Sequence, residues 1–357
     1  MDTKTSLFYQ DKPVFGLDIG RASVKVMQVD TNDNKSVVSG YGNASFDPKA
    51  IEKGVIVDPE PIVKAAYELI TKGLIGTITT NHVALSLPNE YSFSRILVLP
   101  KMNSNDLAAA VQNEAEQSIP MPLTELYYDY TVNSVLEDGS IEVQLIAASK
   151  AIVDSYMMVA NALNLEVALI ETNISAVTRI VRHSETTKDA VSLIIDFGST
   201  AADLSIYDGN TLRITGTADC GSDHITELIA KSLKVSPQQA HTIKTRYGLE
   251  LSKKQKDIVG AIEGELTKLI NETKKVMRYY NDRTKDGKID QIIILGGGAN
   301  LPGLSTYITD RIRVPARLCD PWQHLSFGKL QPPHQLETTL YTTSGGLSLV
   351  DPAEIAK

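Results

Sequence analysis

The sequence predicts an α/β protein of two lobes, with a smaller unit inserted in the first of them. The main observation is a pattern that occurs at residues 14–29 and again at 193–207. In each copy an apolar run ends in Asp, a small turn with Gly follows, and a second strand alternates polar and apolar residues. The 357 residues also exceed one typical domain. Two matched β-hairpins therefore indicate a duplicated framework whose turns face a shared cleft.

Helical and strand patterns alternate along most of the chain, as expected for this class. Asp58 is placed to cap a helix that ends near Gly73. Further expected helices lie at 104–118, 151–163, 173–183, 225–233, 237–246, 256–280, 301–311 and 340–349. Expected strands outside the two hairpins lie at 36–46, 82–87, 91–99, 126–136, 141–148, 166–170, 211–216, 291–295 and 314–318.

One stretch interrupts the framework with a self-contained strand–helix–strand–strand order, in which Asp138 and Gly139 lie in a hairpin turn. We interpret it as an inserted domain and assign it residues 84–163. The first lobe then comprises 13–83 with 164–188 and 339–357. The second lobe comprises 189–225 with 289–338, and 226–288 form its helical subdomain.

Composition limits the function classes and the location. The formal net charge of −8 and the pI near 5.4 argue against a broad nucleic-acid surface. Cys220 and Cys319 lack CxxC spacing, which favours reduced thiols in a cytoplasmic protein. The N-terminus has no secretion signal, and no apolar run approaches the roughly 18 residues that a membrane span needs. We therefore expect any contact with a membrane to pass through a partner.

The repeated hairpins predict a phosphate site. Gly20 and Gly198 give the turns their conformational freedom, and successive backbone N–H groups of such turns can accept phosphate oxygens. Lys25 can place a positive charge near the β- and γ-phosphates. The hydroxyl donors expected at this site belong to Ser23, Ser199 and Thr200.

Asp18 and Asp196 predict a divalent cation. Two carboxylates beside a triphosphate would repel it unless a cation lies between them. Mg²⁺ suits this position because it keeps most of its waters and takes few direct protein ligands. We therefore assign Asp18 and Asp196 as Mg²⁺ ligands that act through water.

A third glycine-rich turn follows the buried strand 291–295 and precedes a helix. Ligands of open α/β sheets bind outside the carboxyl ends of the strands, so this turn can contact an adenosine. We assign Gly296, Gly297, Gly298 and Asn300 to that contact. The chain has neither GxxxxGK[S/T] nor GxGxxG, so the sequence supports neither a P-loop nor a dinucleotide fold.

Together these motifs resemble the actin-like ATPase superfamily. By that resemblance, 18–25 with Arg21 and Ala22 is the first phosphate motif, 196–203 the second, and 296–298 the adenosine motif. The fold it implies has two lobes built on duplicated RNase H-like domains, with an FtsA-type, SHS2-like domain inserted in the first. The resemblance also assigns ribose or adenine contacts to Glu272 and Lys275, and a site role to Lys244. His241 departs from the Glu that is usual beside this Lys.

The insert narrows the resemblance to the PilM family of type IV pilus assembly proteins. The matching segments are 15–20, 57–60, 99–102, 113–116 with 119–122, 129–130 and 320–322. The family implies ATP binding with Mg²⁺ and recruitment of the N-terminal cytoplasmic tail of a PilN-like inner-membrane protein, in a groove between the first lobe and the insert. Further partners that it implies are other pilus platform proteins and the assembly ATPase. A homo-oligomer is left open.

Hydrolysis is expected to be slow. Glu171, at the start of a connecting helix, is the candidate to polarise the attacking water, but Thr172 and Asn173 depart from the usual EPxA pattern. One alternative is a small-molecule kinase of the same superfamily, for which the sequence offers no substrate-binding polar cluster. The other is an FtsA-like division protein, whose basic amphipathic C-terminal anchor is not present in this chain.

Overall fold

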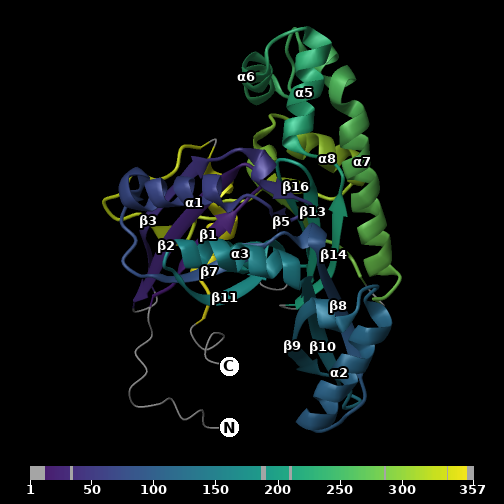
Figure 1. Cartoon of the computed structure of the whole chain (residues 1–357). Coiled ribbons are helices and arrows are strands. Elements are labelled where there is room, and N and C mark those ends of the chain that lie inside the picture. The colour runs from purple at the N-terminus through teal and green to yellow at the C-terminus, as the bar shows by residue number, and fades with distance from the viewer. Residues whose placement is uncertain are drawn as a thin grey trace.

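The computed structural model describes residues 13–32, 35–185, 190–208, 211–284, 287–335 and 337–351, arranged as two lobes and a smaller projecting unit (Figure 1). The remaining parts of the predicted domains, among them 186–188 and 352–357 of the first lobe, lie outside the described residues. No helix of the described ranges is both long and apolar enough to cross a bilayer.

The sheet of the first lobe has the strand order β11-β7-β1-β2-β3-β17, with β6 beside β3. Its strands are β1 (Phe15–Ile19), β2 (Ser23–Asn32), β3 (Lys35–Ser45), β6 (Ile75–Gly76), β7 (His82–Leu87), β11 (Glu166–Thr172) and β17 (Leu325–Ser326). Helices α1 (Pro59–Glu68) and α3 (Lys150–Ala162) pack on the face that carries Phe15 and Leu17. Asp58 caps α1 by accepting a hydrogen bond from the Glu60 N–H, as predicted. A two-stranded ribbon, β4 (Ile51–Glu52) and β5 (Val55–Ile56), lies between β3 and α1 in the chain.

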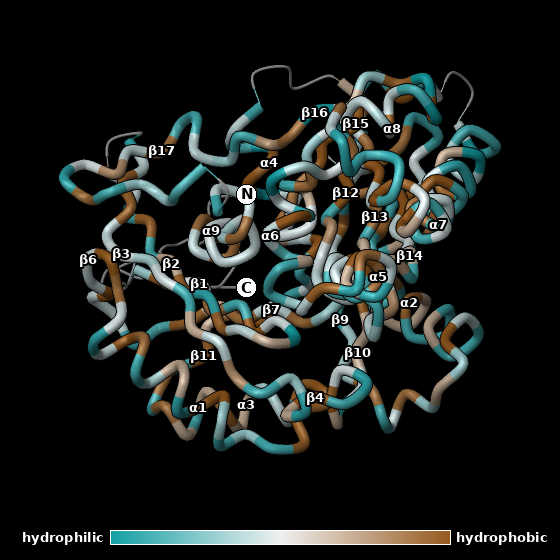
Figure 2. Tube along the Cα trace, turned by 90° about the horizontal axis from the view of Figure 1, so that it is seen from above, coloured by the Kyte–Doolittle hydropathy of each residue, from teal (hydrophilic) through white to brown (hydrophobic). Residues whose placement is uncertain are grey.

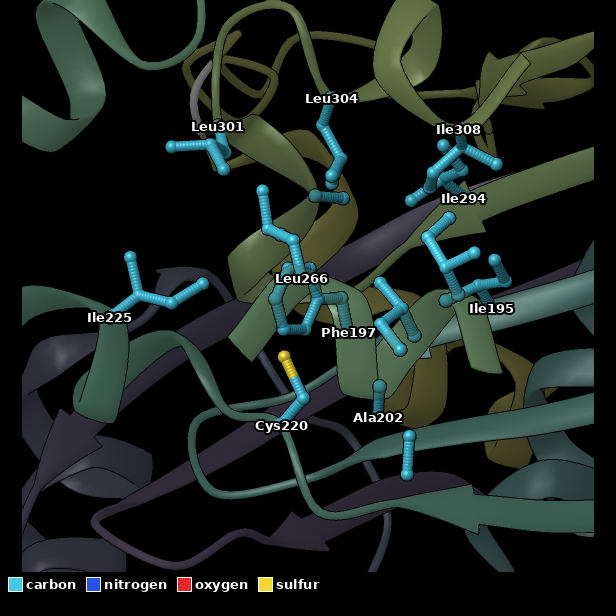
Figure 3. Packing of buried hydrophobic residues seen from close by; sticks show 14 of the residues in the cluster. Ile195, Phe197, Ala202, Cys220, Ile225, Leu266, Ile294, Leu301, Leu304 and Ile308 are labelled. Carbon is cyan, nitrogen blue, oxygen red and sulfur yellow. The ribbon is translucent and has the colours of Figure 1, made fainter. Parts of the chain in front are cut away.

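The sheet of the second lobe has the order β14-β13-β12-β15-β16. Its strands are β12 (Ser192–Phe197), β13 (Ala202–Asp208), β14 (Thr211–Ala218), β15 (Gln291–Leu295) and β16 (Ala316–Leu318). Its helices are α5 (Ser222–Leu233), α6 (Pro237–Tyr247), α7 (Gln255–Asn281) and α8 (Leu304–Ile312). Figure 3 shows how Phe197 of β12 and Ile294 of β15 meet Leu266 of α7 in one core. The predicted helical subdomain thus shares its core with the sheet.

Helix α7 is amphipathic, as its sequence predicts, and Figure 2 shows hydrophilic and hydrophobic residues in turn along it. Its buried side includes Ile258, Ile262 and Leu266. Gly260 and Gly264 lie on the exposed side, and a Cβ added at either would meet no heavy atom within 4 Å.

We predict that Gly260→Ala and Gly264→Ala each raise the free energy of unfolding by about 0.5–1 kcal/mol. Glycine in a helix interior loses more backbone entropy on folding than alanine does. Urea titration of the purified variants measures the change. A loss of stability in both variants would contradict it.

Two helices, α4 (Asn173–Ser184) and α9 (Thr342–Ser348), lie between the sheets of the two lobes. Figure 2 shows α9, pale because Thr, Ser and Gly have nearly neutral hydropathy, between β1–β2 and β12–β13. The helices cross closely, since a Cβ on Gly346 would lie 1.9 Å from the Ala176 carbonyl oxygen. A Cβ on Gly16 of β1 would lie 2.0 Å from the Ser344 oxygen. Small residues therefore let α9 touch both α4 and the first sheet.

The inserted unit is smaller than the predicted range 84–163. A three-stranded sheet, β8 (Ser92–Leu99), β10 (Ile141–Ser149) and β9 (Leu126–Val135), packs on α2 (Ser104–Ser118) around its own core. Strand β7 instead lies in the first-lobe sheet, and α3 buries Ile152, Tyr156 and Val159 in the first-lobe core. The prediction differed because a strand and a helix flank the insert in the chain, and only packing shows which core they join.

Candidate functional site

A cavity of about 580 Å³ lies where the turns of both hairpins meet the turn after β15. Most of the residues that the sequence assigned to a nucleotide line it. They are Asp18, Gly20, Arg21, Ala22, Ser23, Lys25, Asp196, Gly198, Ser199, Thr200, Lys244, Gly296, Gly297 and Gly298. Segments almost 280 residues apart in the chain thus form one site.

The first hairpin pairs a carboxylate with a cation. Asp18 and Lys25 lie opposite each other on β1 and β2, so the seven-residue spacing reflects their cross-strand register. Lys25 Nζ donates to Asp18 Oδ2 at 3.0 Å, and the Ser86 hydroxyl of β7 donates to Asp18 Oδ1 at 2.9 Å. The Gly20 N–H closes the turn on the Ser23 carbonyl oxygen at 3.0 Å. The side chains at this turn are therefore held in place before any ligand arrives.

The second hairpin repeats this geometry with a different charge. Asp196 and Asp203 lie opposite each other on β12 and β13, and the Gly198 N–H closes the turn on the Ala201 oxygen at 2.9 Å. Asp203 accepts hydrogen bonds from Asn173 Nδ2 at 2.9 Å and from the Thr217 hydroxyl at 2.8 Å. Two facing carboxylates at one wall of the cavity make that wall strongly acidic.

The pKa of Asp196 is raised to about 7, first by burial and then by the negative charges of Asp203 and Asp18. Burial also raises the pKa of Asp203, although its hydrogen bonds from Asn173 and Thr217 oppose the rise. The ionised form of Asp196 is thus disfavoured in a folded protein that holds no cation there.

The surroundings of Asp18 and Asp196 show whether a divalent cation fits between them. Among the described residues, no group of three or more His, Cys, Asp or Glu side chains forms a metal site. Asp18 already accepts bonds on both oxygens, while the raised pKa of Asp196 shows that positive charge would be favourable beside it. The residues therefore fit a cation that keeps most of its waters, as Mg²⁺ does.

Gly296 gives the third turn its shape. Its φ of +86° and ψ of 169° lie in a region that is essentially restricted to glycine. A Cβ there would lie 2.3 Å from Asp196 Oδ1 and 2.7 Å from the Phe197 oxygen. The Thr339 hydroxyl donates to the Gly296 carbonyl oxygen at 2.8 Å. This turn therefore lies directly against the carboxylate wall.

Lys244 lines the cavity, but its ammonium group bonds to the protein. Nζ donates to the Ser222 carbonyl oxygen at 2.9 Å, to the Ser222 hydroxyl at 2.7 Å and to the Thr226 hydroxyl at 2.8 Å. Burial lowers the pKa of Lys244 to about 8, and the charge of Asp223 opposes that change. Lys244 thus joins α6 to the start of α5 at the cavity wall.

Four assigned residues are not among those that line the cavity. Glu171 forms a two-pronged ion pair with Arg179, one prong of which is 2.9 Å long. Asn300 is the last residue of the short helix η5 (Gly297–Asn300), beyond the three glycines. Glu272 and Lys275 pair with each other at 2.9 Å on α7 and line a separate groove. Glu171 lies in β11, two residues before α4 begins, whereas it was expected at the start of that connecting helix.

Other cavity residues were missed by the sequence analysis. Ser86 bonds to Asp18 and Asn173 bonds to Asp203, while Thr339 comes from the short helix η6 (Thr338–Tyr341) and Thr342 and Thr343 begin α9. One signal was available for the first two. Ser86 lies at the carboxyl end of β7 and Asn173 follows β11, and both strands run parallel to β1 in the same sheet.

The pKa of Asp196 gives a testable pH dependence. A folded-state pKa near 7, above the unfolded value of 3.8, means that the contribution of Asp196 to stability is fully present below pH 3.8 and is lost as pH rises through 7. Between pH 6 and pH 8 without added cation, we expect wild type to lose about 1.4 kcal/mol relative to Asp196→Asn. Urea titrations of both proteins at the two pH values measure this. Parallel pH profiles would contradict the assignment.

Comparisons with known proteins agree with this architecture. The family described as type IV pilus assembly protein PilM matches residues 16–351. A solved structure of a PilM–PilN type IV pilus biogenesis complex superimposes with a TM-score of 0.82 at 22% identity, covering 95% of this chain and 98% of that one. MreB5 of Spiroplasma citri bound to ADP gives a TM-score of 0.56 at 13% identity, covering 96% and 97%. The predicted actin-like fold is therefore confirmed.

Two relatives found by sequence are cell division proteins. Cell division protein FtsA of Enterococcus hirae is 24% identical over 352 residues, which cover 86% of this chain and 78% of that protein. FtsA of Borreliella burgdorferi is 22% identical over 351 residues, covering 85% and 84%. The family match covers nearly the whole chain, so this protein belongs to the PilM family of type IV pilus assembly proteins.

Proposed function

We propose that this protein is an ATP-binding scaffold of a type IV pilus assembly platform, or of a related type II secretion or competence system. The observation that carries the proposal is the cavity in which two hairpins of the same geometry, one with Lys25 and one with Asp203, face a glycine-rich turn. The fold neighbour MreB5 is described as bound to ADP, and its likeness adds support.

Specific atoms of the chain would hold the nucleotide. The N–H groups of Gly20 and Gly198 already donate within their own turns. The phosphate oxygens would therefore accept hydrogen bonds from the N–H groups of Arg21, Ala22, Ser199 and Thr200. Lys25 would add positive charge, and the turn at Gly297 would lie against the nucleoside. Mg²⁺, held through water by Asp18 and Asp196, would offset the repulsion between phosphates and carboxylates.

We propose that hydrolysis is slow or absent. Glu171 is the residue assigned to the attacking water, but its carboxylate is engaged by Arg179. Asn173, the first residue of α4, donates to Asp203 instead. ATP would then act as a ligand that closes the two lobes on each other, and their closure would set the shape of a partner surface.

The proposed partner is the N-terminal cytoplasmic tail of a PilN-like inner-membrane protein, which would place this protein peripherally at the cytoplasmic face of that membrane. The solved PilM–PilN complex supports this assignment. The junction between first lobe and insert offers a surface for such a tail, since Tyr127 of β9 donates to Asp154 of α3 at 3.2 Å. Tyr127 and Met158, one turn after Asp154, are exposed on the two elements that meet there. An apolar segment would cover these side chains.

Calorimetric titration tests both parts of the proposal. We expect ATP with Mg²⁺ to bind the wild type, and Lys25→Ala to weaken binding roughly tenfold or more because a charged hydrogen-bond donor is lost. Lys64→Ala, on the exposed side of α1, is the matched control and should bind as wild type does. A synthetic PilN tail peptide is titrated with and without ATP.

Two outcomes would overturn the proposal. Absence of ATP binding would remove the nucleotide role, and absence of tail binding in both nucleotide states would remove the scaffold role. Rapid phosphate release in a single-turnover assay would contradict slow hydrolysis. ATP consumption that depends on a sugar would point to the small-molecule kinase instead.

A further inference from the structure

A second cavity of about 490 Å³ separates the insert from the second lobe. It shares no lining residue with the nucleotide cavity. Its walls come from β8 of the insert, β14 of the second lobe and the C-terminal half of α7, three elements that lie close together in Figure 1. Glu272 and Lys275, which the nucleotide site does not use, lie in this groove.

Strand edges form two sides of the groove. In the described part of the chain, β8 is the terminal strand of the three-stranded sheet and β14 is the terminal strand of the five-stranded sheet. Consecutive residues, 94–96 of β8 and 212–216 of β14, line the groove. Since successive side chains of a strand point to opposite faces, a run of consecutive lining residues means that the backbone edge faces the groove. Unpaired edges of this kind accept an additional strand.

The charged side chains around these edges are mainly cationic. Arg95, Arg213, Lys275 and Arg283 line the groove against one carboxylate, Glu272, although the whole protein carries a net charge of −8. Arg213 pairs with Glu142 at 2.5 Å and Lys275 with Glu272 at 2.9 Å.

Two cations are left to face the groove. Arg95 is exposed, and neither it nor Arg283 forms an ion pair with any carboxylate of the described ranges. The Arg283 guanidinium stacks on the Tyr279 ring, 3.3 Å from its centroid. The groove therefore keeps a positive charge that no carboxylate of the described residues neutralises.

The groove also has an apolar floor and unmet polar groups. Val276 of α7 approaches β14 so closely that a Cβ on Gly216 would lie 2.7 Å from its Cγ2. Ile96 and Ile214 add apolar surface from the two strands. Glu142 Oε1 of the insert and Arg213 Nε of β14 are buried without a hydrogen-bond partner, although Arg213 Nε lies 3.8 Å from Asp208 Oδ2. Backbone edge, alternating apolar contacts and excess positive charge lie within one groove.

We propose that this groove binds an extended acidic segment of a partner protein, which adds a strand along the β14 edge. Main-chain hydrogen bonds to β14 supply affinity, and acidic side chains on the partner meet Arg95 and Arg283. Nucleic acid fits less well, because it has no strand-forming backbone and the protein as a whole is acidic. A partner bound here touches insert and second lobe together, so it fixes their relative position.

Fluorescence anisotropy with the full chain tests this proposal. The probe is a fluorescein-labelled peptide of alternating Glu and Thr, about eight residues long to match a typical strand. We expect saturable binding that weakens with added salt, and roughly tenfold weaker binding to Arg95→Glu. Lys64→Glu is the matched control, because it changes the net charge equally but lies on α1, outside the groove. A peptide with proline at alternate positions removes the strand-forming N–H groups and should not bind.

Four results would overturn the proposal. The first is no saturable binding at millimolar Glu–Thr peptide, and the second is equally tight binding of an alternating Lys and Thr peptide. The third is an equal loss of affinity in Arg95→Glu and Lys64→Glu. The fourth is full displacement of the Glu–Thr peptide by inorganic pyrophosphate at the same concentration. Tighter binding of a labelled oligothymidine would assign the groove to single-stranded nucleic acid instead. Circular dichroism of each variant shows that the fold is retained.

Discussion

Gly296→Ala should lower the free energy of unfolding by roughly 3 kcal/mol and abolish nucleotide binding. A side chain at a φ of +86° is strained, at about 1–3 kcal/mol. The added Cβ would also lie 2.3 Å from Asp196 Oδ1, so the carboxylate or the turn must move. Both lie in the wall of the proposed nucleotide site, and their displacement changes its shape. Urea titration and ATP calorimetry measure the two effects.

The adjacent glycine supplies the control for this substitution. A Cβ on Gly297 would meet Leu340 Cδ1 at 3.9 Å, an ordinary contact, and Gly297 has no positive φ. We therefore expect Gly297→Ala to change stability by less than about 0.5 kcal/mol. If Gly296→Ala proves as stable as Gly297→Ala, the turn does not depend on a positive φ at residue 296.

Gly346→Ala should lower the free energy of unfolding by about 3 kcal/mol or more, because it separates the helices that join the two lobes. Its Cβ would lie 1.9 Å from the Ala176 oxygen, which is a backbone atom and cannot rotate away. Overpacking of a rigid core commonly costs about 1–3 kcal/mol, and a backbone clash lies at the upper end. Chemical denaturation measures the loss.

Gly260→Ala is the appropriate comparison for Gly346→Ala, since both introduce the same methyl group into a helix. A Cβ at Gly260 meets no neighbouring atom, so Gly260→Ala should raise the free energy of unfolding. A Cβ at Gly346 would clash with α4. Opposite signs would show that the contact between α4 and α9, not helix propensity, decides the effect. A Gly346→Ala variant as stable as Gly260→Ala would mean that the two helices do not cross this closely.

The two glycine predictions concern different parts of one arrangement. Gly296 belongs to the wall of the proposed nucleotide site, and Gly346 belongs to the helix pair between the two sheets. Thr339 and Thr342 connect these regions. The Thr339 hydroxyl donates to the Gly296 carbonyl oxygen, and the Thr339 carbonyl oxygen accepts from the Thr342 hydroxyl at 3.0 Å. A change in the angle between the lobes would thus reach the cavity through the start of α9.

The sequence by itself determined the local framework. The repeated pattern at 14–29 and 193–207 predicts two β-hairpins of the same design, and both form, with Asp18 opposite Lys25 and Asp196 opposite Asp203. Asp58 caps its helix as predicted. Strand periods, caps and turns depend on neighbours in the chain, so they can be read from a single sequence.

Only the tertiary structure decided which side chains meet. Glu171 pairs with Arg179 and Lys244 with Ser222, while Glu272 lies in the groove beside the insert rather than in the proposed nucleotide site. Strand β7 and helix α3 belong to the first lobe because their apolar faces complete its core. The burial of the Lys244 ammonium group and of the apolar faces of β7 and α3 depends on contacts between segments far apart in the chain, and a local pattern of residues does not specify such contacts.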